Sequence, residues 1–145
     1  MKNYRIYVEK YPRFQVEADT LRKELNNNLG LNLQSLRLLN VYDLFGFTEE
    51  LLEKSRYAVF GEIVTDCVND ECDLDGKKYL AVEYLPGQFD QRASSAVACV
   101  RLIEPTAEVR IKSSKLLIFD SAITDEELAR VERYYINAVE SRRKD

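Results

Sequence analysis

The chain has 145 residues, of which 46% are hydrophobic and 32% charged, and its net charge is −4. This length and composition are typical of one globular domain. The acidic balance and the scattered basic residues argue against nucleic acid or an anionic membrane as a partner. No apolar run is long enough to span a bilayer and no secretory leader opens the sequence, so we expect a cytoplasmic protein.

Histidine is absent, and only three cysteines are present. The absence of histidine excludes Ser-His and Cys-His catalytic pairs. The cysteines have neither the spacing of a zinc site nor that of a disulfide framework, so no metal site is predicted and the thiols are expected to be reduced. The acidic run at 69–77 does not match a calcium-binding loop either.

The first half of the chain predicts the order strand, helix, strand, helix, strand. Alternation of Ile6 and Val8 with polar residues indicates the first strand, and Gly30 ends the first helix. Thr48 is an N-cap residue. The predicted elements are strands at 4–11, 36–45 and 62–68, a helix at 17–29 and a second helix that begins after Thr48.

The second half repeats this order after an acidic connector at 69–77 that ends in a turn. Its predicted elements are strands at 79–85 and 109–119 and helices at 90–103 and 124–136. Thr124 and Glu127 form a capping box. Cys99 is expected in the core, beside the apolar stripe of its helix. The last strand of the first half has no predicted counterpart, which suggests that the chain is a piece of a longer one.

Two short runs at the starts of the halves are similar. Residues 6–12 read IYVEKYP and residues 80–86 read LAVEYLP. Such self-similarity indicates a duplicated fold. We therefore predict a single α+β domain over 1–145, with repeats at 4–68 and 78–141 related by pseudo-twofold symmetry. Its sheets are expected to be largely antiparallel and covered by helices on one face.

The candidate site is the turn at 86–92, which differs most from its counterpart at 12–17. Its predicted contact residues are Gln88, Asp90, Gln91 and Arg92. Asp90 can cap the following helix, and the amides there could receive an anionic group beside Arg92. A simple turn with a capping aspartate and a solvated arginine explains the same residues. No catalytic residue is predicted.

The run LAVEYLPGQFDQRA at 80–93 resembles the N-terminal region of bacterial large-type phosphoribosylformylglycinamidine synthase. The segments RIYVEK at 5–10, YIN at 135–137 and VESR at 139–142 resemble the same family, so that the likeness extends over almost the whole chain. Ala138 departs from it, because proline is expected there.

The resemblance implies a role in purine biosynthesis. The family is a carbon–nitrogen ligase of the glutamine amidotransferase type, which converts formylglycinamide ribonucleotide to the amidine with glutamine, ATP and magnesium. Its N-terminal region is similar to a dimer of the small PurS-type subunit, each half having the order β-α-β-α-β. This chain would then be a noncatalytic assembly domain, without cofactors of its own, that bridges the synthetase and glutaminase regions of the same polypeptide.

The alternative is a free-standing duplicated α+β module that binds a small metabolite and regulates a partner. If the chain is an assembly domain without its partners, its exposed apolar interface makes self-association of the isolated piece an expected side effect.

Overall fold

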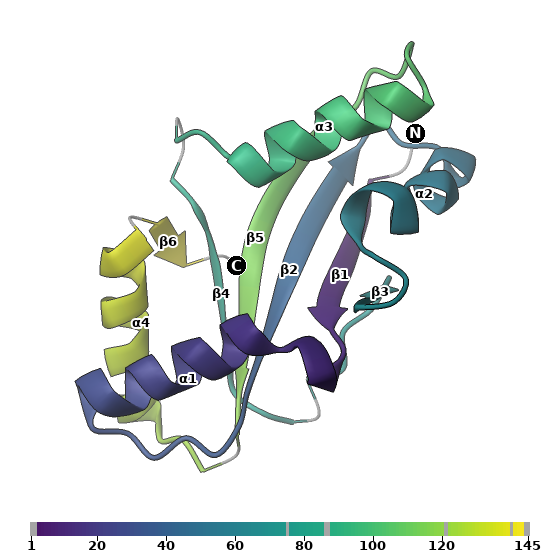
Figure 1. Cartoon of the computed structure of the whole chain (residues 1–145). Helices are drawn as coiled ribbons and strands as arrows, with labels where there is room; N and C mark the ends of the chain where they lie inside the picture. Colours follow the sequence, from purple (N-terminus) through teal and green to yellow (C-terminus); the bar gives the residue numbers. More distant parts are fainter. Residues whose placement is uncertain (1–2, 75, 86–87, 121, 140, 144–145) are drawn as a thin grey trace.

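The computed structural model describes residues 3–74, 76–85, 88–120, 122–139 and 141–143. They form one six-stranded antiparallel sheet with helices on one face (Figure 1). The strands are β1 (Tyr4–Lys10), β2 (Leu36–Phe45), β3 (Asp66–Asn69), β4 (Tyr79–Tyr84), β5 (Arg110–Phe119) and β6 (Ser141–Arg143). The helices are α1 (Val16–Leu29), α2 (Glu49–Ser55), α3 (Gln91–Ile103) and α4 (Asp125–Val139), with a 3₁₀ turn η1 (Pro12–Phe14) and a π-helical turn η2 (Arg56–Phe60).

The strand order in the sheet is β3-β1-β2-β5-β4-β6. The strands of residues 4–69 thus lie together, as do those of residues 79–143, and β2 and β5 meet at the centre. These two pair along their full lengths, from Leu36 opposite Phe119 to Phe45 opposite Arg110. Both parts of the chain have the element order β-α-β-α-β. The predicted α+β class and antiparallel pairing are confirmed.

Helix boundaries agree with the capping signals in the sequence. Thr48 Oγ1 accepts the amide of Leu51 at 3.1 Å, and the predicted box at the start of α4 has both of its bonds. Gly30 follows α1 with φ 65°, in the left-handed region where a glycine costs least. Local chemistry therefore ends these elements where the sequence indicates.

The expectation that the second half lacks its last strand is wrong. After α4, the segment β6 pairs antiparallel with β4, with Ser141 opposite Tyr84. It has only three residues and no apolar alternation, so nothing in the sequence pattern marks it as a strand. The missing strand therefore no longer supports the inference that the second repeat is truncated.

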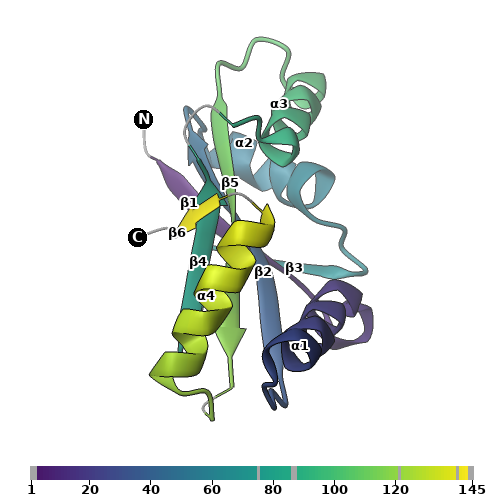
Figure 2. The same cartoon turned by 90° about the vertical axis from the view of Figure 1, so that its left-hand side faces the viewer.

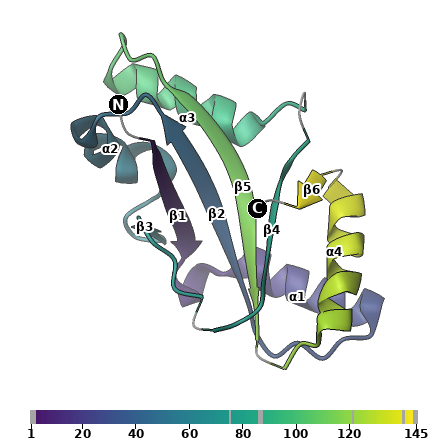
Figure 3. The ribbon, with the colours of Figure 1, turned by 180° about the vertical axis from the view of Figure 1, so that it is seen from behind.

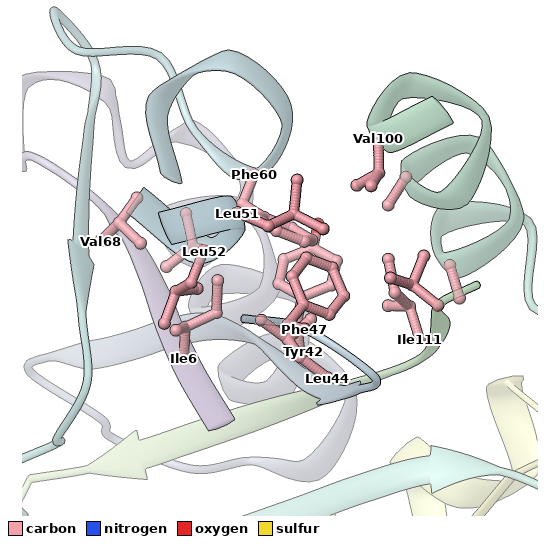
Figure 4. Packing of buried hydrophobic residues seen from close by; sticks show 14 residues of the cluster. Ile6, Tyr42, Leu44, Phe47, Leu51, Leu52, Phe60, Val68, Val100 and Ile111 are labelled. Carbon is pink, nitrogen blue, oxygen red and sulfur yellow. The ribbon is translucent and has the colours of Figure 1, made fainter. Parts of the chain in front are cut away.

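Two hydrophobic cores fill the helix-covered face, and each combines both parts of the chain. The α2–α3 core packs Ile6, Leu44 and Phe47 against Val100 and Ile111, as Figure 4 shows. The rings of Tyr42 and Phe60 pack against each other within it at a tilt of 52°, with their centroids 4.8 Å apart. Because α2 and α3 come from different halves, this core exists only when the halves are together.

The α1–α4 core lies at the other end of the same face (Figure 2). Leu25 of α1 and Val131 of α4 are fully buried in it, together with Leu117 and Phe119 of β5. Here too the two helices belong to different halves. Each half thus contributes one helix to each core, so the two parts of the chain share both cores and neither part has a complete core of its own.

On the opposite face of the sheet, the described residues form no helix (Figure 3). A third cluster lies there, formed by Leu39, Val41, Leu116 and Ile118, with Cys72 and Leu74 of the connector packed against it. The acidic connector therefore contributes two side chains to the cover of this face. Burial raises the pKa of the Cys72 thiol above its usual value.

Candidate functional site

Asp90 ties the start of α3 to the centre of the sheet. Its Oδ1 accepts the amide of Ala93 at 2.9 Å, which is the predicted N-cap bond. The same carboxylate accepts the amide of Ser113 at 2.8 Å and the Ser113 hydroxyl at 2.7 Å. Since Ser113 is buried in β5, Asp90 has a positioning role that the sequence did not reveal.

Gln88 also bonds within its own turn. Its Oε1 accepts the amide of Leu85 at 2.6 Å. Between these two residues Phe89 points outward with 73% of its surface exposed, and Gln91 begins α3 on its exposed side. The four predicted residues therefore divide into two that hold the backbone, Gln88 and Asp90, and two that remain available for contacts, Gln91 and Arg92. Pro86 and Gly87 lie outside the described residues.

Arg92 lines a groove that runs across the helix-covered face, between the α1–α4 and α2–α3 cores. The groove consists of adjoining cavities of about 80, 250 and 420 Å³, and Arg92 lines all three. We call it the central groove. Its polar lining includes Glu17, Asn40, Tyr42, Tyr84, Arg92, Lys115 and Tyr135.

The floor of the central groove lies where the two halves join. Asn40 of β2 and Lys115 of β5 are directly opposite each other in the sheet. Glu17 of α1 reaches Lys115, with 2.7 Å between Oε1 and Nζ. The groove thus combines side chains that lie far apart in the sequence.

The environment of the groove shifts two of its pKa values. Burial lowers the pKa of Arg92, but the neighbouring Tyr42 hydroxyl and the charge of Glu17 outweigh it, so that the pKa lies above its usual value. Burial, with a smaller contribution from Glu17, raises the pKa of Tyr135 to about 12. At neutral pH the groove therefore presents a cationic guanidinium and a protonated phenol.

The lining supplies hydrogen-bond donors, cations and the acidic residues Glu17, Asp66 and Glu83, which suits binding. Among the described residues, no cluster of acidic or cysteine side chains has the arrangement of a metal site. Within the same part of the chain, no helix is both long and apolar enough to cross a membrane.

Comparisons with known proteins give no relative: no family model, no curated protein and no solved structure matches the chain.

Sequence reasoning missed Asn40, Lys115 and Tyr135 as groove residues. A signal was present, because strand alternation places Asn40 between the inward-facing Leu38 and Tyr42. A polar residue at an inward position of a central strand indicates a cavity or a polar partner. Cys99, expected in the core, is exposed and lines the same cavity of the groove as Gln91. Its helix is turned so that Ala96 and Val100 face the core instead.

Proposed function

We propose that this chain is the PurS-like N-terminal assembly domain of a phosphoribosylformylglycinamidine synthase. The observation that carries the proposal is the repeated order β-α-β-α-β in a sheet whose two sets of three strands meet through β2 and β5. The resemblance at 80–93 implies this architecture, a duplicated PurS-type unit with a pseudo-twofold axis. In that arrangement β1, β2 and β3 correspond to β4, β5 and β6.

The antiparallel register of the central strands is compatible with a pseudo-twofold axis beside Asn40 and Lys115. The pairs Leu36–Phe119 and Leu44–Ile111 lie on opposite sides of the Asn40–Lys115 pair. Each is the same number of residues away from it along the strands. If β2 and β5 are equivalent strands in this register, the twofold operation exchanges these two pairs. The helices support the same relation, since α1 packs with α4 and α2 with α3.

The role that follows is assembly rather than chemistry. Glutamine hydrolysis and the ATP- and magnesium-dependent ligation belong, in this proposal, to the glutaminase and synthetase regions of the same polypeptide. The domain would hold the glutaminase and synthetase regions in a fixed relative position. Phe89 is a suitable contact, because an exposed large aromatic side chain gains most from being covered by a partner. Gln91 and Arg92 are its polar neighbours.

Reconstitution in trans tests the proposal. A phosphoribosylformylglycinamidine synthase from the same organism, lacking its N-terminal domain, should form little amidine alone and regain activity when this chain is added. Phe89→Ser should weaken the complex about tenfold or more, because truncation of a buried interface aromatic removes a large share of binding energy.

The matched control is Leu102→Ser, which removes another highly exposed apolar side chain, near the far end of α3. It should leave reconstitution unchanged. Absence of both activity and complex formation would overturn the assembly proposal. It would favour the second candidate, a metabolite-binding module, for which the central groove is the supporting observation.

A further inference from the structure

Two cations of the central groove face the same small cavity. Arg92 of α3 and Lys115 of β5 both line the cavity of about 80 Å³. Lys115 is paired with Glu17. Arg92 has no ion pair with any described residue. Arg92 is exposed and has no directly paired carboxylate among the residues described, although the charge of Glu17 acts on it from a distance. A guanidinium without a direct partner can bind an anion through paired donors.

Two neutral groups in the cavity wall also lack partners. Tyr135 is 8% exposed, lines the cavity, and makes no hydrogen bond within the described part of the chain. The Oδ1 of Asn40 is buried without a hydrogen-bond partner. Rotation about the last side-chain bond of Asn40 would present its Nδ2 donors to the cavity instead. Buried polar groups are seldom left unpaired, so the Asn40 side chain points to a polar ligand, and the Tyr135 hydroxyl lies in the same cavity wall.

The described acidic residues near this cavity do not form an ion pair with Arg92. Glu17 is 60% exposed at its side chain and lines the neighbouring cavities rather than this one. Glu83 contributes to the cavity wall, but its neighbour Val82 faces the helices, so strand alternation directs the Glu83 side chain to the other face of the sheet. With Lys115 paired to Glu17, Arg92 is the cation of this cavity wall that has no paired carboxylate in the described parts of the chain.

We propose that the central groove binds a small anion, the phosphate or carboxylate group of a metabolite, between Arg92 and Lys115. Arg92 supplies a planar pair of donors, Lys115 a point charge, and Tyr135 and Asn40 neutral donors. Glu17 then competes with the ligand for Lys115. Because Asn40 and Glu17 come from one half and Arg92, Lys115 and Tyr135 from the other, the ligand connects the two halves. The proposal does not depend on the assembly function.

The test is a titration of the ¹⁵N-labelled chain with inorganic phosphate and, separately, with acetate, at ionic strength held constant with chloride. Saturable shifts of the amide signals of Arg92, Lys115 and Tyr135 are expected with at least one of the anions. A response to phosphate alone identifies a phosphate group as the ligand, and a response to acetate alone identifies a carboxylate.

Two variants should change the dissociation constant in opposite directions. Arg92→Gln should raise it about tenfold or more, since the main charge partner is lost. Glu17→Gln should lower it several-fold, since a competing carboxylate is lost. Arg101→Gln is the matched control, because Arg101 is an exposed arginine in the last turn of the same helix. It should leave the dissociation constant unchanged.

Unfolding curves of each variant separate loss of the site from loss of the fold. Shifts that grow linearly with either anion, without saturation, would overturn the proposal. So would equal binding by Arg92→Gln and Arg101→Gln in variants that unfold like the parent chain.

Discussion

Expressed separately, residues 1–74 and residues 75–145 are expected to give no folded monomer. Each half keeps its strands but loses one helix from each core: the first half retains α1 without α4, and α2 without α3. The inner edges of β2 and β5 also lose their backbone partners. Because each half has only part of both cores and domains are only marginally stable, we expect the whole cooperative transition to disappear.

Thermal unfolding and analytical ultracentrifugation measure this directly. Each half alone should be unfolded or self-associated, and mixing the two should yield a one-to-one complex with a cooperative transition. A chain cut at the connector by a protease is the control, because it has the same break after normal folding. A monomeric half that unfolds cooperatively would contradict the shared cores.

Asp90→Ala should lower the free energy of unfolding by about 3 kcal/mol. Loss of an N-cap bond costs about 1 kcal/mol, and the buried amide of Ser113 loses its acceptor at a further cost of about 1–3 kcal/mol. Chemical denaturation with a two-state analysis measures the change.

Gln91→Ala is the matched control, since Gln91 is the exposed neighbour of Asp90 and belongs to the same helical turn. It should change the stability by less than about 0.5 kcal/mol. A double variant of Asp90 and Ser113 should lose less than the sum of the two single losses, because they share their hydrogen bonds. Equal stabilities of Asp90→Ala and Gln91→Ala would show that the link between α3 and β5 is not formed.

This result also bears on how activity data are interpreted. Asp90 and Gln88 hold the turn that presents Phe89 and Arg92. A loss of reconstitution on changing Asp90 therefore reports displaced neighbours. Of the residues in this turn, Phe89, Gln91 and Arg92 are suited to report direct contacts with the proposed partner regions.

Local chemistry accounts for the elements that the sequence predicts well. The strand predicted at 36–45 is β2, with the same bounds. The caps at Thr48, Asp90 and Thr124 form the predicted bonds. These features depend on residues within a few positions of one another, so alternation and capping chemistry are enough to locate them.

The features that the sequence does not predict depend on distant residues. The strand β6 forms because the free edge of β4 lies beside it, and its own three residues carry no pattern. The central groove requires the register in which Asn40 lies opposite Lys115, and no local signal fixes that register. Arg92 could be named as a candidate from the turn alone, whereas its partners could not.

The shared cores, the proposed twofold relation and the anion site all depend on the pairing of β2 with β5. Nuclear Overhauser contacts across these strands in the labelled chain test it most directly. The predicted result is a set of cross-strand contacts between Leu38 and Leu117, Asn40 and Lys115, and Tyr42 and Ser113. Contacts that place Asn40 opposite any other residue, or none between the two strands, would contradict the arrangement of the two halves described here.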